Sequence, residues 1–188
     1  MAGGTEFSLA QGMSLITGVI AVVTDLWRRK IPNNLTFPSI FLGLCFAFLI
    51  QGWTGLLSGL LGALVAMVCF GLPMALGWMG AGDVKLLMAL GAWQGPRFCI
   101  QVAAFSLFYG ALLTLVLLLV SGGLFGFFAR FWRFARSHLI PGLEPVPFQV
   151  NRRLKMPFAI PMVLAVAAQI WGDPWGIGHW VFGGIWND

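Results

Sequence analysis

Long apolar runs with almost no charge most strongly restrict what this chain can fold into. Hydrophobic residues make up 59% of its 188 residues and charged residues only 9%, which is not the composition of a soluble globular domain. Several runs reach the roughly 17–25 residues that a helix needs to cross a bilayer. In lipid, a helix satisfies its own backbone hydrogen bonds. The sequence therefore predicts an all-α integral membrane protein with several spanning helices.

Turn-forming residues divide these runs into six predicted spans of one domain that covers residues 1–188. The clearest break is Ile31-Pro32-Asn33-Asn34, because proline disfavours helical geometry in the residue before it. Further breaks are expected at Gln51-Gly52-Trp53-Thr54-Gly55, at Gly80-Ala81-Gly82 and at Gln94-Gly95-Pro96-Arg97. The spans are expected at residues 9–24, 35–50, 56–78, 83–95, 98–120 and 157–171.

A basic segment, residues 121–156, separates the fifth and sixth predicted spans. Arg130, Arg133 and Arg136 recur there at every third position among Phe and Trp residues. This pattern predicts an amphipathic helix that lies on the cytoplasmic membrane surface. We interpret it as an anchor, and the alternative is a lip that contacts a substrate.

The positions of Lys and Arg predict the orientation of the chain in the membrane. With the N-terminus outside, the loops after spans one, three and five face the cytoplasm and hold ten of the eleven basic residues, with only Arg97 outside. Six spans then place the C-terminus outside as well. Because the basic residues form short clusters between apolar runs, they indicate membrane topology and lipid contact rather than nucleic-acid binding.

Asp25 and Asp83 are the two acidic residues attached directly to apolar spans. Carboxylates at membrane depth are rare and usually functional. At the helical rise of about 1.5 Å per residue, Asp83 lies roughly 18 Å inward from Gly95, and Asp25 roughly 24 Å inward from Leu9. Both are therefore expected near the inner boundary of a hydrocarbon core about 30 Å thick. We expect them to share a water-accessible pocket there.

Two facing carboxylates suit the chemistry of an aspartic protease. Adjacent like charges cannot both ionise cheaply, so the pair holds one proton. The ionised member then activates a water, and the protonated member polarises the scissile carbonyl. The alternative for each aspartate alone is a helix-end residue paired with a nearby base, Arg28 or Lys85.

The cysteines do not indicate a metal site. Cys45, Cys69 and Cys99 are widely spaced within or beside apolar runs and form no CxxC pair. We expect small apolar side chains on helices, with no metal, no disulfide framework and no cofactor.

Three motifs resemble those of the type IV prepilin peptidases, the GxGD family of membrane aspartic proteases. Gly80-Ala81-Gly82-Asp83, continued by Val84-Lys85, is similar to the family's second catalytic motif. Asp25 with Ile31-Pro32-Asn33 resembles the first, and Pro157-Phe158-Ala159-Ile160-Pro161 resembles its proline-aromatic segment. The resemblance implies that Asp25 and Asp83 are catalytic, with support from Gly80, Gly82, Lys85, Ile31, Pro32, Asn33 and Pro157.

The resemblance also implies a substrate and a location. Members cleave the short basic leader of prepilins, whose mature part begins with an apolar helix, at the cytoplasmic face of the bacterial inner membrane. Large members also methylate the new N-terminus and carry paired CxxC motifs between the first two spans. That loop is about ten residues here and contains no cysteine. We therefore expect a form with peptidase activity alone, similar to the small enzymes of tight-adherence (Flp-type) pilus systems.

Three other functions remain open from the sequence. A presenilin-like intramembrane protease also uses GxGD, but it pairs this motif with Tyr-Asp, whereas Asp25 follows Thr24 and the sole tyrosine is Tyr109. An ion-coupled carrier could use the same two aspartates, although carriers usually show inverted repeats and broken helices in both halves. A non-catalytic subunit of a secretion machine would not need the motifs.

Overall fold

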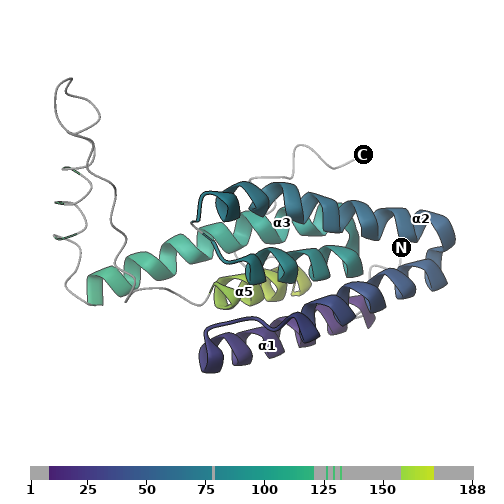
Figure 1. Cartoon of the computed structure of the whole chain (residues 1–188), viewed down its shortest axis with the longest axis horizontal. Coiled ribbons are helices and arrows are strands. Elements are labelled where there is room, and N and C mark those ends of the chain that lie inside the picture. The colour runs from purple at the N-terminus through teal and green to yellow at the C-terminus, as the bar shows by residue number, and fades with distance from the viewer. Residues whose placement is uncertain are drawn as a thin grey trace, which may run out of the picture. The chain divides into compact units, whose positions relative to one another are not determined.

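The computed structural model describes residues 9–77, 79–120 and 158–171, with single positions at 126, 129 and 132 (Figure 1). It contains α1 (Leu9–Arg28), α2 (Asn33–Ala75), α3 (Ala81–Val120) and α5 (Ala159–Ile170). The chain divides into two compact units, residues 1–110 with 157–188, and residues 111–156. The first unit holds α1, α2, α5 and the part of α3 up to Gly110. The predicted amphipathic helix lies outside the described residues except for those three positions.

The described residues confirm the predicted all-α class. α1, α2 and α3 are each long and apolar enough to cross a membrane, while α5 is a shorter apolar helix of 12 residues. Many large apolar side chains on these helices are exposed, including Leu64, Val68 and Phe41. Such exposure is costly in water but is the expected surface of a protein whose solvent is lipid. This chain is a multi-pass membrane protein.

Two glycines interrupt the long helices where turns were predicted. Gly52 in α2 has φ 63° and Gly95 in α3 has φ 84°, a region that glycine enters at little cost. α2 and α3 each reverse direction at this point (Figure 1). A Cβ at Gly55 would collide with the carbonyl oxygen of Ala47 on the preceding half of α2.

Glycines also bring α2 and α3 into backbone contact. A Cβ at Gly62 would collide with the carbonyl oxygen of Gly91, and one at Gly59 would lie 2.8 Å from that of Ala92. On the other half of α2, a Cβ at Gly43 would lie 3.1 Å from the Trp93 backbone nitrogen. Small residues allow membrane helices to approach closely, which favours their association. The first part of α3 is thus held between the two halves of α2.

The remaining contacts complete the core of this unit. A Cβ at Gly18 of α1 would lie 2.8 Å from Val163 of α5, so these two helices pack closely. The Phe70 and Phe158 rings meet edge to face at 5.7 Å between centroids. The largest fully buried apolar side chains are Phe70, Leu86, Leu87, Leu90, Met162, Val102 and Val166.

Several predicted boundaries differ from the structure. α2 begins at Asn33 rather than 35 and ends at Ala75 rather than 78, and α5 covers Ala159–Ile170 rather than 157–171. α1 continues to Arg28 rather than ending at Thr24, so Asp25 lies in its last turn. α3 begins at Ala81 rather than Asp83, which places Asp83 in the first helical turn. The physical reason is local: the Gly80 N–H donates to Asp83 Oδ2 at 3.2 Å, and the Asp83 N–H donates to the Gly80 carbonyl at 3.1 Å. A carboxylate that caps the backbone in this way starts a helix.

Candidate active site at the start of α3

Asp25 is buried within the helix bundle. Only 9% of its surface is exposed, and it lies on the face of α1 that also buries Thr17, Gly18 and Ala21. These positions recur at three-, four- and eight-residue intervals, so they share one side of the helix. Just after Asp25, the Arg29 N–H donates to its carbonyl oxygen at 2.7 Å, and Arg29 has a positive φ of 49° that turns the chain out of α1.

Asp83 is half-buried at the opening of α3. Its carboxylate accepts the hydrogen bond from Gly80, which fixes the side chain at the N-terminus of the helix. Acidic side chains are common at this position, because the N-terminus of a helix is the positive end of its dipole. A Cβ at Gly80 would lie 3.2 Å from the same Oδ2 atom, so a larger residue at this position would crowd the carboxylate.

The segment after α1 lies directly against the start of α3. A Cβ at Gly82 would lie 3.1 Å from the Ile31 Cβ. Lys85 Nζ donates to Asn33 Oδ1 at 2.9 Å and lies 5.1 Å from the centroid of the Phe37 ring. The end of α1, the start of α2 and the start of α3 therefore lie at one end of this unit (Figure 1).

Most of the residues expected to support the site are thus in contact with one another. Ile31 with Gly82, Asn33 with Lys85, and Gly80 with Asp83 form three contacting pairs. Pro32 precedes α2 in an extended conformation, with φ −73° and ψ 142°. Pro157 lies outside the described residues. Its neighbour Phe158 packs against Gly110, where an added Cβ would lie 3.2 Å from Phe158 Cε2.

Hydrogen bonds to hydroxyl side chains link α1, α2 and α3. The Thr17 and Ser39 hydroxyl oxygens lie 3.1 Å apart, and Trp93 Nε1 donates to Ser39 Oγ at 3.1 Å. Gln94 Nε2 donates to Ser14 Oγ at 3.0 Å. These residues were not among those predicted from the sequence. The helical period of α1 could have identified two of them, because Ser14 and Thr17 fall on the same helical face as Asp25.

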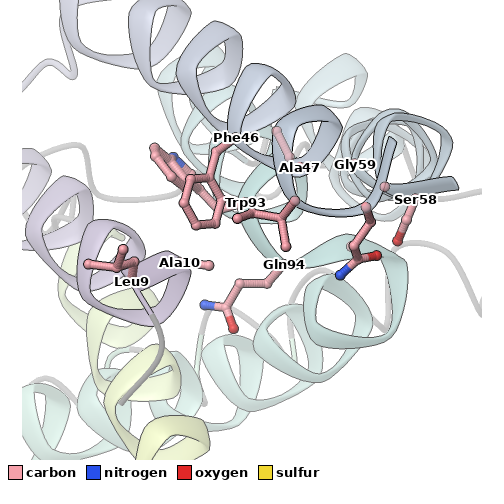
Figure 2. Close-up of a pocket in the computed structure, with 13 residues that line it drawn as sticks. Leu9, Ala10, Phe46, Ala47, Ser58, Gly59, Trp93 and Gln94 are labelled. Carbon is pink, nitrogen blue, oxygen red and sulfur yellow. The ribbon is translucent and has the colours of Figure 1, made fainter. Parts of the chain in front are cut away.

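A pocket of about 410 Å³ lies at the other end of this unit (Figure 2). It is lined by the first residues of α1, by α2 around Gly52, and by α3 at Trp93, Gln94 and Gly95. Figure 2 shows the Trp93 and Phe46 side chains together, and their ring centroids are 5.6 Å apart. Leu9 in its wall precedes Asp25 by sixteen residues of α1, roughly 24 Å at the helical rise. The pocket is therefore separate from the aspartates.

The fold and this arrangement define a class: a multi-pass helical membrane protein with one acidic residue in the last turn of α1 and another in the first turn of α3. Residues 13–119 match the model of the type IV leader peptidase family, and the chain belongs to that family. This confirms the family predicted from the motifs. The matched region includes both aspartates and every expected supporting residue except Pro157.

Curated relatives carry the name prepilin leader peptidase/N-methyltransferase. The chain is 34% identical to one from Aeromonas hydrophila over 115 residues, which are 56% of this chain and 39% of that protein. It is 36% identical to one from Burkholderia pseudomallei (strain K96243) over 98 residues, 49% of this chain and 32% of that protein. It is 29% identical to one from Myxococcus xanthus (strain DK1622) over 127 residues, 63% and 38% respectively. The matches thus span less than half the length of these relatives. No solved structure matches the chain.

Proposed function

We propose that this chain is a membrane aspartic endopeptidase that removes the leader of type IV prepilins of the Flp kind. Asp25 and Asp83 form its aspartate pair. The observation that carries the proposal is the contact of Ile31 with Gly82 and of Asn33 with Lys85, because it brings the two acid-bearing segments to one end of the helix bundle. Family membership supports the same reaction.

The proposed mechanism follows from a shared proton. The ionised carboxylate accepts a proton from water while the water oxygen attacks the scissile carbonyl carbon. The protonated carboxyl donates its hydrogen bond to the carbonyl oxygen. The peptide C–N bond then breaks, and the leaving amine takes a proton from the pair. Because the two carboxyl groups share one proton, we do not assign the ionised role to Asp25 or to Asp83.

We propose that the chain crosses the membrane six times, with both termini outside. In this arrangement α2 and α3 each cross twice and reverse at Gly52 and Gly95. The aspartate pair then faces the cytoplasm at the bacterial inner membrane, near the junction between a basic leader and an apolar substrate helix. Lipid surrounds the exposed apolar side chains.

The chain is proposed to lack the N-methyltransferase activity named for its longer relatives. Only residues 29–32 connect α1 to α2, and none of them is a cysteine. This connection has no room for an inserted domain between these helices. The reaction therefore stops at a free N-terminal amine.

Co-expression with an Flp-type prepilin tests the peptidase function. The wild-type chain should shorten the precursor, whereas Asp25→Asn and Asp83→Asn should each lower the cleavage rate by about 10³-fold, since each removes the proton exchange of the pair. Lys30→Met is the control for expression and insertion. Cleavage that persists in both aspartate variants would exclude the pair. Ion uptake by reconstituted protein that is lost in the same variants would instead favour a carrier.

A further inference from the structure

Lys85 connects two helices that adjoin the aspartates. It is half-buried in α3, two residues after Asp83, and its Nζ donates to Asn33 Oδ1 at 2.9 Å. Asn33 is the first residue of α2, 52 positions away in sequence. The ammonium also lies 5.1 Å from the centroid of the Phe37 ring, one turn further along α2. Lys85 thus makes both a charge-assisted hydrogen bond and a cation–π contact with α2.

A second contact lies beside the first. Ile31 precedes Asn33 by two residues, and Gly82 precedes Lys85 by three, and these two residues pack against each other. Pro32 between Ile31 and Asn33 has a ring that fixes φ. The chain after α1 is therefore stiff at the position where α3 meets it. A hydrophobic contact and a polar contact together set the distance between the two segments.

We propose that Lys85 is a positioning residue that fixes Asp83 relative to Asp25. It holds the start of α3 on the start of α2, and α2 is joined by four residues to the helix that carries Asp25. This inference rests on the proposed function and assigns Lys85 no contact with the reacting atoms. Without the Lys85 side chain, both carboxylates are present, but the distance between them is no longer fixed.

Kinetics of the purified protein in detergent test this role. Lys85→Met keeps the aliphatic stem but removes the donors and the charge. It should lower kcat by about 10²-fold, the cost of a misplacement of about 1 Å, and leave KM for the precursor nearly unchanged. Lys85→Arg retains a cation and donors and should recover most of kcat. Lys30→Met removes an exposed cation in the connection between α1 and α2 and serves as the control.

A double variant tests whether Lys85 acts through Asn33. Asn33→Ala should lower kcat, and Lys85→Met with Asn33→Ala should be no slower than Lys85→Met alone, because both changes break the same bond. Unchanged kcat in Lys85→Met, a rise in KM alone, or additive losses in the double variant would each overturn the inference. If Asp83→Asn stops cleavage while Lys85→Met does not affect it, the proposed function stands and the role of Lys85 fails.

Cross-linking supplies a test that does not need activity. Ile31→Cys and Gly82→Cys, with Cys45, Cys69 and Cys99 changed to Ala, would place two Cβ atoms 3.1 Å apart, so a small separation of the two segments gives the roughly 3.5–4.5 Å of a disulfide. The pair should oxidise rapidly with Lys85 present and several-fold more slowly in Lys85→Met. Equal rates in both backgrounds would contradict the proposed positioning role, whatever the protein cleaves.

Discussion

At the residue scale, the side chains of the candidate site could be identified from the sequence, but their hydrogen-bond partners could not. The sequence indicated Asp25 and Asp83 because acids attached to apolar spans are rare. It could not show that Asp83 caps its own helix through Gly80, since that depends on the start of α3. Nor could it pair Thr17 with Ser39, because hydroxyl residues are common in apolar helices and their partners are set only by packing.

Gly82 offers a direct test at this scale. Gly82→Val adds a branched side chain where even a Cβ would lie 3.1 Å from Ile31, so the two segments must separate. We expect a loss of kcat of about tenfold or more, as for other small displacements of catalytic groups. The measurement is precursor cleavage at matched protein levels.

Gly71→Val is the matched control for that substitution. Gly71 lies within α2, and a Cβ there would have no heavy atom within 4 Å. It should cleave at the wild-type rate. Equal activity of the Gly71 and Gly82 variants would contradict a close approach at Gly82.

At the element scale, the positions of the turns could be predicted and the contacts between helices could not. The breaks were predicted where Gly, Pro and Gln interrupt the apolar pattern, and the structure places Gly52 and Gly95 within them. The boundaries near Arg28 and Ala81 were displaced by a few residues, since helix ends depend on capping contacts. The Gly62–Gly91 contact was not predictable, because all apolar faces of a membrane helix resemble one another in sequence.

The Gly62–Gly91 contact predicts a large effect on stability. Gly62→Leu should destabilise the protein by about 1–3 kcal/mol or more, because the side chain would enter the backbone of α3. Its Tm in detergent should fall, whereas Gly71→Leu should leave the Tm nearly unchanged. A Gly62→Leu protein as stable as the wild type would exclude this packing.

The two positive-φ glycines predict unequal costs. Gly95 has φ 84° and ψ −176°, a region populated essentially by glycine alone, so Gly95→Ala combines a backbone strain of about 1–3 kcal/mol with a Cβ only 2.6 Å from Ser58 Oγ. Gly52→Ala carries the same kind of strain but has no neighbour within 4 Å. Thermal unfolding should show Gly95→Ala as the less stable variant, and the reverse order would contradict the geometry of the α3 break.

At the scale of the whole molecule, composition was enough to predict a membrane protein of helices. The orientation stays a prediction from charge, based on where Arg28, Arg29 and Lys30 lie relative to Arg97. The arrangement of helices could not be derived, because α1 packs on α5 across more than a hundred residues of sequence. That contact is set by shape, with Gly18 facing Val163.

Labelling of intact cells with a membrane-impermeant maleimide tests the proposed orientation. In a background without native cysteines, Gln51→Cys should react from outside, because Gln51 is exposed at the Gly52 turn. Lys30→Cys should react only after the membrane is opened. Labelling of Lys30→Cys in intact cells would reverse the orientation and place the aspartates on the outer side.

The central claim is that Asp25 and Asp83 meet in one site. The most direct measurement is oxidative cross-linking of Asp25→Cys with Asp83→Cys in the cysteine-free chain, with a protease site inserted at the exposed Gln51 turn to separate the two halves. We predict that the halves stay joined until reduced, while Gln51→Cys paired with Asp83→Cys gives two separate fragments. Failure of the 25–83 pair to cross-link in well-inserted protein, under conditions where the 31–82 pair does, would contradict the claim.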